Sequence, residues 1–199
     1  MGFAKRSIAG LTILAVGVCS FADFDGAAPV AWRFIESTKA VPGGVPIEKD
    51  GVVYIALGGR VYALDKATGN LKWRYPAGEP LQANFRSGVT LAGGKVIAAN
   101  DNRVMVALNA SDGELAWQYN GADLITGTPV VAQNYVVVPT GSSLMAVNLS
   151  DGAQAWANPL VYKDRFYSRL AAWNNLVIFP TVDSELVAVD VETQKEKWS

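Results

Sequence analysis

Short runs that alternate apolar and polar residues, or are apolar throughout, recur along the chain from about residue 44 to its end. Each run is about five residues long and rich in Val and Ile, as expected of β-strands. Another short apolar piece lies just before each run, across a turn that contains Gly or Asn, which is typical of a hairpin. The pattern therefore predicts an all-β chain of four-stranded units. The clearest runs are Val52–Ala56, Lys95–Ala99, Tyr135–Val138 and Leu176–Phe179.

A segment of eleven residues repeats four times between these runs. Every copy begins with Ala, carries Asp or Asn at its third position and ends on Trp eight residues later. Trp32 keeps the same phase, so consecutive tryptophans of the series are 41, 44, 39 and 42 residues apart. Four strands in a repeat of this length indicate the blades of a β-propeller, because the repeats of leucine-rich and hexapeptide solenoids are shorter. The copies are Ala63–Trp73, Ala107–Trp117, Ala146–Trp156 and Ala188–Trp198.

The repeated segment has the chemistry of a tight turn. Its Asp or Asn ends the third strand, where the side chain accepts backbone N–H groups, and its Gly supplies a positive φ. The Trp then begins the outer strand and covers the neighbouring blade. The fourth copy has Gln194 in place of Gly, which predicts either a strained turn or a different loop. The remaining turn residues are Asp65, Asn109, Asn148, Asp190, Gly69, Gly113 and Gly152.

The pattern Ala-x-Asp-x-x-Thr-Gly-x-x-x-Trp resembles the tryptophan-docking motif of the PQQ-like (pyrroloquinoline quinone-like) repeat family, over residues 30–199. That family includes BamB-like assembly factors and quinoprotein dehydrogenases. The resemblance implies a structural role for Trp73, Trp117, Trp156 and Trp198, each packed on the next blade. It implies a fold more strongly than a function, because the motif builds blades and the chemistry lies elsewhere.

The blade count predicts an incomplete ring. We expect blades at about 44–76, 86–120, 126–158 and 168–199, preceded by a lone outer strand at 30–36 that contains Trp32. Rings of the family normally have seven or eight blades, so the chain resembles part of a longer propeller. Two alternatives are a closed ring of four blades and self-association through exposed blade edges.

The first 22 residues have the order of a signal peptide: Lys5-Arg6, an apolar run, and small residues before Asp23. We expect cleavage after Ala22, a mature chain of residues 23–199, and a location in the periplasm or outside the cell. The apolar run is shorter than the roughly 20 residues of a membrane-spanning helix. Lipidation of Cys19 is the alternative, and it would add a membrane tether.

Composition excludes several kinds of site. The chain has no His and one Cys, which removes Ser-His-Asp and Cys-His pairs, His-based zinc sites and paired-cysteine redox centres. Seventeen basic and eighteen acidic residues give a formal net charge of −1, which does not favour nucleic acid. Residues 100–103, Asn-Asp-Asn-Arg, lack the later ligands of a calcium loop and are interpreted as a turn. We predict no catalytic, cofactor-binding or metal-binding residue.

The candidate binding residues lie in the connections between blades, which carry binding groups in many folds. Two connections share Phe-x-Ser after polar residues, and their arginines and aromatics suit an extended peptide or a glycan. The alternative is that Phe85 and Phe166 fill the ring while the arginines pair with acids. The candidates are Asn84, Phe85, Arg86, Arg165, Phe166, Tyr167 and Arg169.

These observations favour an exported, non-catalytic propeller that binds a protein or peptide partner as a scaffold in the cell envelope, similar to BamB-like members of the family. One alternative is the N-terminal part of a quinoprotein dehydrogenase, for which PQQ and Ca²⁺ would be required. The other is the extracellular sensor or polymer-binding domain of a larger protein.

Overall fold

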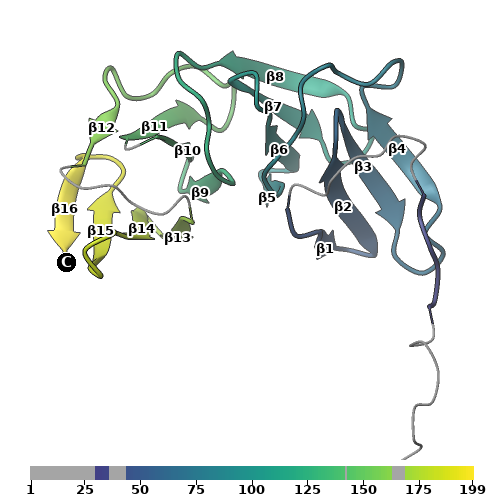
Figure 1. Ribbon diagram of the computed structural model, residues 1–199, viewed down its shortest axis with the longest axis horizontal. Helices are drawn as coiled ribbons and strands as arrows, with labels where there is room; N and C mark the ends of the chain where they lie inside the picture. The colour runs from purple at the N-terminus through teal and green to yellow at the C-terminus, as the bar shows by residue number, and fades with distance from the viewer. Residues whose placement is uncertain (1–29, 36–43, 142, 163–168) are drawn as a thin grey trace, which may run out of the picture. The chain divides into compact units, whose positions relative to one another are not determined.

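The structure is a computed structural model of the chain, and it describes residues 30–35, 44–141, 143–162 and 169–199 (Figure 1). All of these except Val30 belong to one compact unit, Ala31–Ser199. The described residues form sixteen β-strands and no helix, which confirms the predicted all-β class. Over the same ranges there is accordingly no apolar helix long enough to cross a membrane.

The strands form four antiparallel sheets, and each sheet takes four strands in chain order. The first contains β1 (Ile47–Lys49), β2 (Val52–Leu57), β3 (Arg60–Asp65) and β4 (Leu71–Tyr75). The second contains β5 (Thr90–Ala92), β6 (Lys95–Ala99), β7 (Val104–Asn109) and β8 (Leu115–Asn120). The third contains β9 (Val130–Ala132), β10 (Tyr135–Thr140), β11 (Ser143–Asn148) and β12 (Leu160–Val161). The fourth contains β13 (Ala171–Trp173), β14 (Leu176–Pro180), β15 (Leu186–Asp190) and β16 (Lys195–Trp198).

The third blade departs from the predicted range, because its outer strand β12 lies beyond residue 158. Trp73 and Trp117 lie inside β4 and β8, whereas Trp156 lies at a bend ahead of β12. Pro159, which has no N–H to donate to a neighbouring strand, follows this bend directly before β12 begins at Leu160. β12 then pairs with Ser143 and Leu144 at the start of β11. The prediction that the Trp begins the outer strand is therefore wrong for this blade.

The lone outer strand predicted at 30–36 is also wrong for its described part, because residues 30–35 form no strand. The outer edge of the first sheet is occupied by β4, which pairs with β3. The segment instead lies against the first sheet through two aromatic contacts. Phe34 meets Tyr62 with ring centroids 5.1 Å apart, and the Trp32 indole donates a hydrogen bond to the Lys66 carbonyl at 2.8 Å.

The three junctions between neighbouring sheets use the same kind of tryptophan contact as Trp32. The indole N–H of Trp73 donates to the carbonyl of Ala110 in the second sheet at 2.9 Å. Trp117 donates to Leu149 of the third blade at 2.9 Å, and Trp156 donates to Val191 of the fourth at 2.9 Å. Each acceptor follows the turn's Asp or Asn by one residue. We call this acceptor carbonyl and the turn's fifth residue, Gly or Gln, a seat.

Glycine is required in three of the seats by space as well as by backbone conformation. A Cβ at Gly113, whose φ is +77°, would lie 2.6 Å from the Trp73 ring. Gly69 under Trp32 and Gly152 under Trp117 have the same geometry, also with a nearest distance of 2.6 Å. Because real Cβ atoms do not approach so closely, any other residue would displace the indole.

Gln194 keeps the turn geometry of these glycines. Its φ is +55°, and its N–H donates to the Asp190 carbonyl at 2.8 Å, just as the Gly69 N–H donates to the Asp65 carbonyl. Of the two sequence predictions for this position, the strained turn is the one the structure has, and the different loop is not. A non-glycine residue in this left-handed conformation costs about 1–2 kcal/mol.

Carboxylates cap the turns, although not always from the predicted position. The Asp65 carboxylate accepts the N–H groups of Ala67 and Thr68 at 3.1 and 2.9 Å. Asp190 likewise accepts Glu192 and Thr193, both at 3.0 Å. In the turns that begin with Asn109 and Asn148, the carboxylates that accept a backbone N–H are those of Asp112 and Asp151. The predicted acceptor role of the two asparagine side chains is therefore corrected.

Candidate functional site

The connection between the first two blades, residues 76–89, is anchored at three points to strand turns. The Leu81 N–H donates to the Gly59 carbonyl at 3.1 Å, and the Phe85 N–H donates to Gly58 at 2.7 Å. The Asn84 carbonyl accepts the N–H of Asp101 at 2.9 Å. The first two contacts reach the β2–β3 turn and the third reaches the β6–β7 turn. The connection is therefore fixed to both blades that it joins.

Phe85 and Arg86 are neighbours in the sequence, but one side chain is buried and the other is exposed. Phe85 is buried among apolar side chains of the first two sheets, and it makes an isolated β-bridge with Asn100. Arg86 is exposed, and its Nε lies 2.7 Å from the Asp101 carboxylate. For these two residues the structure has the core-filling and ion-pairing arrangement that was the alternative to partner binding. Phe85 is not available to a ligand in this arrangement.

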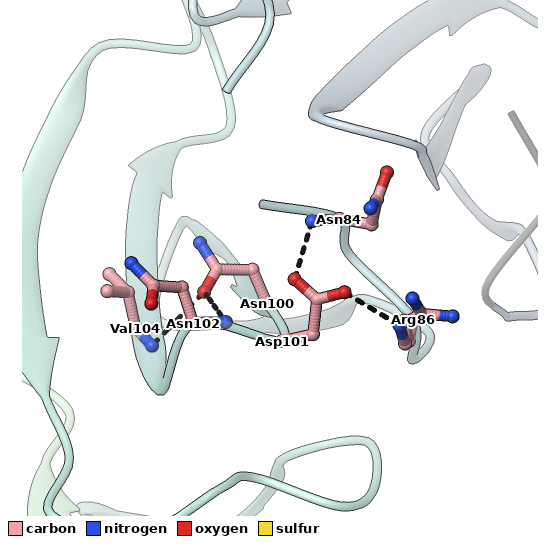
Figure 2. Close-up of polar contacts among 6 residues, drawn as sticks. All are labelled: Asn84, Arg86, Asn100, Asp101, Asn102 and Val104. Carbon is pink, nitrogen blue, oxygen red and sulfur yellow. Dashed lines mark hydrogen bonds and ion pairs between the residues drawn. The ribbon is translucent and has the colours of Figure 1, made fainter. Parts of the chain in front are cut away.

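Asp101 is the centre of a small polar cluster (Figure 2). One carboxylate oxygen accepts the Asn84 N–H at 2.8 Å, and the other accepts Arg86 at 2.7 Å. Burial raises the pKa of Asp101, but the hydrogen bonds from Asn84 and Arg86 outweigh it and hold the pKa below its usual value. The carboxylate is thus ionised and already partnered at neutral pH.

The neighbouring residues 100–103 form a turn, as the sequence indicated. The Asn100 side-chain oxygen accepts the N–H groups of Asn102 at 3.0 Å and Val104 at 3.2 Å (Figure 2). Arg103 has a φ of +63°, which closes the turn. Throughout the described ranges, no three Asp, Glu, Cys or His side chains lie close enough together to hold a metal ion.

A hollow of about 410 Å³ opens beside this cluster. Ala99 and Ile125 give it apolar walls, and Leu124 projects at 48% exposure. Thr126 is held in place by its N–H, which donates to the Pro139 carbonyl at 2.9 Å. The hollow therefore combines an apolar wall with a guanidinium–carboxylate pair, which suits an apolar side chain flanked by polar backbone. Its lining is Arg86, Ser87, Ala99, Asn100, Asp101, Leu124, Ile125 and Thr126.

The structure brings only part of the predicted binding set to this place. Asn84 and Arg86 border the hollow or its polar cluster. Arg169 is exposed, and Arg165, Phe166 and Tyr167 lie outside the described residues. Sequence reasoning missed Leu124 and Ile125. Their signal was two aliphatic residues in an otherwise polar connection, at the place that corresponds to residues 82–87 one blade earlier.

Four-stranded antiparallel blades in chain order, each joined to the next through a tryptophan seat, define a β-propeller repeat protein. A family model described as "Outer membrane protein assembly factor BamB" matches residues 23–199. The chain therefore belongs to this family of PQQ-like repeat proteins, as its repeated motif suggested.

Relatives of two kinds share the repeat. The chain is 36% identical over 108 residues to the outer membrane protein assembly factor BamB of Yersinia pestis. The matched region covers 49% of this chain and 27% of that BamB. It is 33% identical over 125 residues to a quinohemoprotein alcohol dehydrogenase of Comamonas testosteroni. The matched region covers 55% of this chain and 17% of the enzyme. The chain therefore spans only a fraction of the length of these relatives.

A solved structure supports the same fold. The crystal structure of BamB from Moraxella catarrhalis superposes with a TM-score of 0.62 at 19% identity, over 79% of this chain and 49% of that one. At this identity the likeness concerns the fold alone.

Proposed function

We propose that the chain is a non-catalytic, BamB-like binding scaffold that is exported to the cell envelope and holds a protein partner. The family match over residues 23–199 carries this proposal. The relatives named BamB act, by their name, in assembly of outer membrane proteins. A scaffold also suits the construction of the chain, because rigid blades present their connections in fixed positions.

Within this proposal the hollow beside Asp101 is the partner's contact. Arg86 and Asp101 neutralise each other, so the hollow offers no strong net charge to a ligand. The exposed Leu124 and the apolar wall would take a hydrophobic side chain of the partner, while Arg86 has further N–H groups for a backbone carbonyl.

Site-specific photo-crosslinking in cells tests this role. A photoreactive residue at Leu124 should capture an envelope protein. The matched control is Leu115, which is 45% exposed against 48% for Leu124 but lies on the outer strand β8. Equal capture at both positions, or none at Leu124, would contradict a specific contact at the hollow.

Export is tested separately by the mature N-terminus. We expect the protein in the periplasmic fraction to begin at Asp23, after cleavage behind Ala22. A chain that begins at an acylated Cys19 would instead support the lipoprotein alternative, and an uncleaved chain in the cytoplasm would contradict export.

A second proposal, part of a quinoprotein dehydrogenase, is favoured by the similarity to the Comamonas enzyme. Ca²⁺ takes amide and carbonyl oxygens as well as carboxylates, and within the described ranges no three Asp, Glu, Cys or His side chains come together to hold it. No catalytic step is therefore derived for it. Titration with PQQ and Ca²⁺, followed by absorbance, distinguishes the two proposals: saturable binding would support the dehydrogenase and contradict a purely scaffolding role.

A further inference from the structure

The outer strand of the second blade, β8, has a backbone edge that none of the described strands pairs with. The Gly121 N–H donates to the Arg103 carbonyl at 2.8 Å, which continues the antiparallel pairing of β8 with β7. Hydrogen-bonded and non-bonded positions alternate along such a pair. The backbone of Tyr119 therefore also bonds to β7, whereas the N–H and C=O groups of Gln118 and Asn120 point to the outer side.

The first and third blades protect the corresponding edge. In the first blade the repeat places Arg74 and Pro76 at these two positions. In the third blade it places Pro159 at the second of them, after a bend that interrupts the strand. A charged side chain or a proline is a common protection of an edge strand, because the charge opposes pairing and proline donates no N–H. The second blade has Gln118 and Asn120 there, and β8 contains neither a charged residue nor a proline.

The open edge of β8 does not result from a missing neighbouring blade. Trp73 of the first blade donates to a carbonyl of the second, and Trp117 of the second donates to a carbonyl of the third, so the second blade has a described blade on each side. β8 is also the longest of the four outer strands, with six residues against five, two and four in β4, β12 and β16. A long, unprotected edge strand tends to pair with another strand.

The sequence of β8 is complementary to itself in one antiparallel register. In this register Gln118 of each copy faces Asn120 of the other, and Tyr119 faces its own counterpart. Both Gln118–Asn120 pairs lie at hydrogen-bonded positions, where two facing residues exchange two backbone hydrogen bonds. Their side chains are amides, which both donate and accept hydrogen bonds across a strand pair.

Charge favours this pairing in β8 and opposes it in β4. The six residues of β8 are uncharged, so two copies meet without repulsion. The equivalent register in β4 would place Arg74 of each copy opposite Pro76, which has no N–H to donate. The two Arg74 side chains would also lie diagonally across the pair, within reach of each other, and like charges at such positions are destabilising.

We propose that two copies of this chain associate through β8, in an antiparallel pairing centred on Tyr119 that joins two second blades into one continuous sheet. The interface is isologous, because both copies use the same strand. Two short strands bury less than the roughly 1,200–2,000 Å² of a stable interface, so the association is weak and depends on concentration.

This surface is separate from the proposed partner contact. The described residues that line the hollow beside Asp101 include none of β8. Photo-crosslinking from Leu115 in β8 would then yield at most a dimer of the chain, whose mass distinguishes it from the capture of an envelope protein.

The first test gives β8 the protections of the first blade. Sedimentation velocity from about 5 to 500 µM covers the affinities between micromolar and millimolar that we expect. The wild-type chain should associate, and Gln118→Arg or Asn120→Pro should each weaken association at least about tenfold. Gln82→Arg, at an exposed glutamine in the connection between the first two blades, is the matched control and should change nothing. A monomeric wild-type chain, or a Gln118→Arg chain that associates at wild-type strength while circular dichroism shows an intact fold, overturns the proposal.

Disulfide trapping tests the register. In a Cys19→Ser background, which removes the single native thiol, chains with Gln118→Cys are mixed with chains with Asn120→Cys under mild oxidation. Facing residues at a hydrogen-bonded position have Cα atoms about 5.5 Å apart, which a disulfide spans. Two copies of the same variant would hold their cysteines about 8 Å apart, because they are offset by two residues, and this is too far. The mixed dimer, identified by mass, should therefore be the main product. Homodimers in comparable amounts, or no disulfide at all, would overturn the proposed pairing.

Discussion

The middle tryptophan of the repeat series and the last one differ in what surrounds chemically identical residues. Trp117 lies in β8, donates its N–H to the Leu149 carbonyl and packs over Gly152. Trp198 occupies the same place in the repeat and the same position in its sheet, yet it is largely exposed. The difference predicts that such a tryptophan contributes most to stability where its indole is buried on a seat.

The largest expected effect separates these two residues. Trp117→Ala should lower the free energy of unfolding by about 3–5 kcal/mol, because it removes a buried indole and leaves a cavity between two blades. Trp198→Ala should lower it by no more than about 1 kcal/mol, as is usual for exposed positions. Urea unfolding at low protein concentration, followed by circular dichroism, measures both. Similar losses would mean that the seat is not the source of the stability.

The seat can be tested from its other side. Gly113→Ala should destabilise by about 3 kcal/mol, which combines the cost of a positive φ with the overlap between the new Cβ and the Trp73 ring. Gly51 is the matched control, because its φ is also +77° but no atom lies within 4 Å of a Cβ there. Gly51→Ala should therefore cost only about 1–2 kcal/mol.

The difference between these two glycine variants isolates the steric contribution of the indole. In a Trp73→Ala background that difference should disappear, because the overlapping ring is gone. A difference that persists would place the cost of Gly113→Ala in the backbone alone.

The sequence predicted the parts of the fold that are local. Strand order, turn positions and the need for Gly113 follow from a segment of eleven residues, because hydrophobic period and turn chemistry act between near neighbours. The family resemblance followed from the same segment. Each of these features repeats, so one copy supports the interpretation of the others.

What the sequence did not predict depends on neighbours that are distant in the chain. The exchange of Asn109 for Asp112 as the capping side chain is a choice between two acceptors that a pattern cannot rank. The hollow needs Leu124 and Asp101 to meet from separate segments. Trp32 looked like a strand residue, but residues 30–35 form no strand, and its indole instead donates to the Lys66 carbonyl. The displaced outer strand of the third blade had a visible signal, Pro159.

A smaller effect is expected at the irregular seat. Gln194→Gly should raise the free energy of unfolding by about 1 kcal/mol. Glycine adopts the left-handed conformation without strain, and part of that gain is offset because glycine also increases the conformational entropy of the unfolded chain. The measurement is the urea midpoint at constant m-value. An unchanged or lower midpoint would mean that Gln194 makes compensating contacts with the third blade.

The smallest effect concerns pH and compares the turns that begin with Asp with those that begin with Asn. Hydrogen bonds from the backbone N–H groups of Thr193 and Glu192 hold the pKa of Asp190 below its usual value, despite the opposing effect of burial. A lowered folded-state pKa contributes stability above the unfolded pKa of about 3.9, and this stability is lost as the pH falls through the folded value. Asp190→Asn should therefore destabilise at pH 7 by less than about 1 kcal/mol, since its Lys197 partner is half exposed. The loss should shrink below pH 4, where the native carboxyl also takes up its proton.

Asn109→Asp, in a turn already capped by Asp112, should give no comparable gain at pH 7, and urea unfolding of both variants at pH 7 and pH 3 measures the contrast.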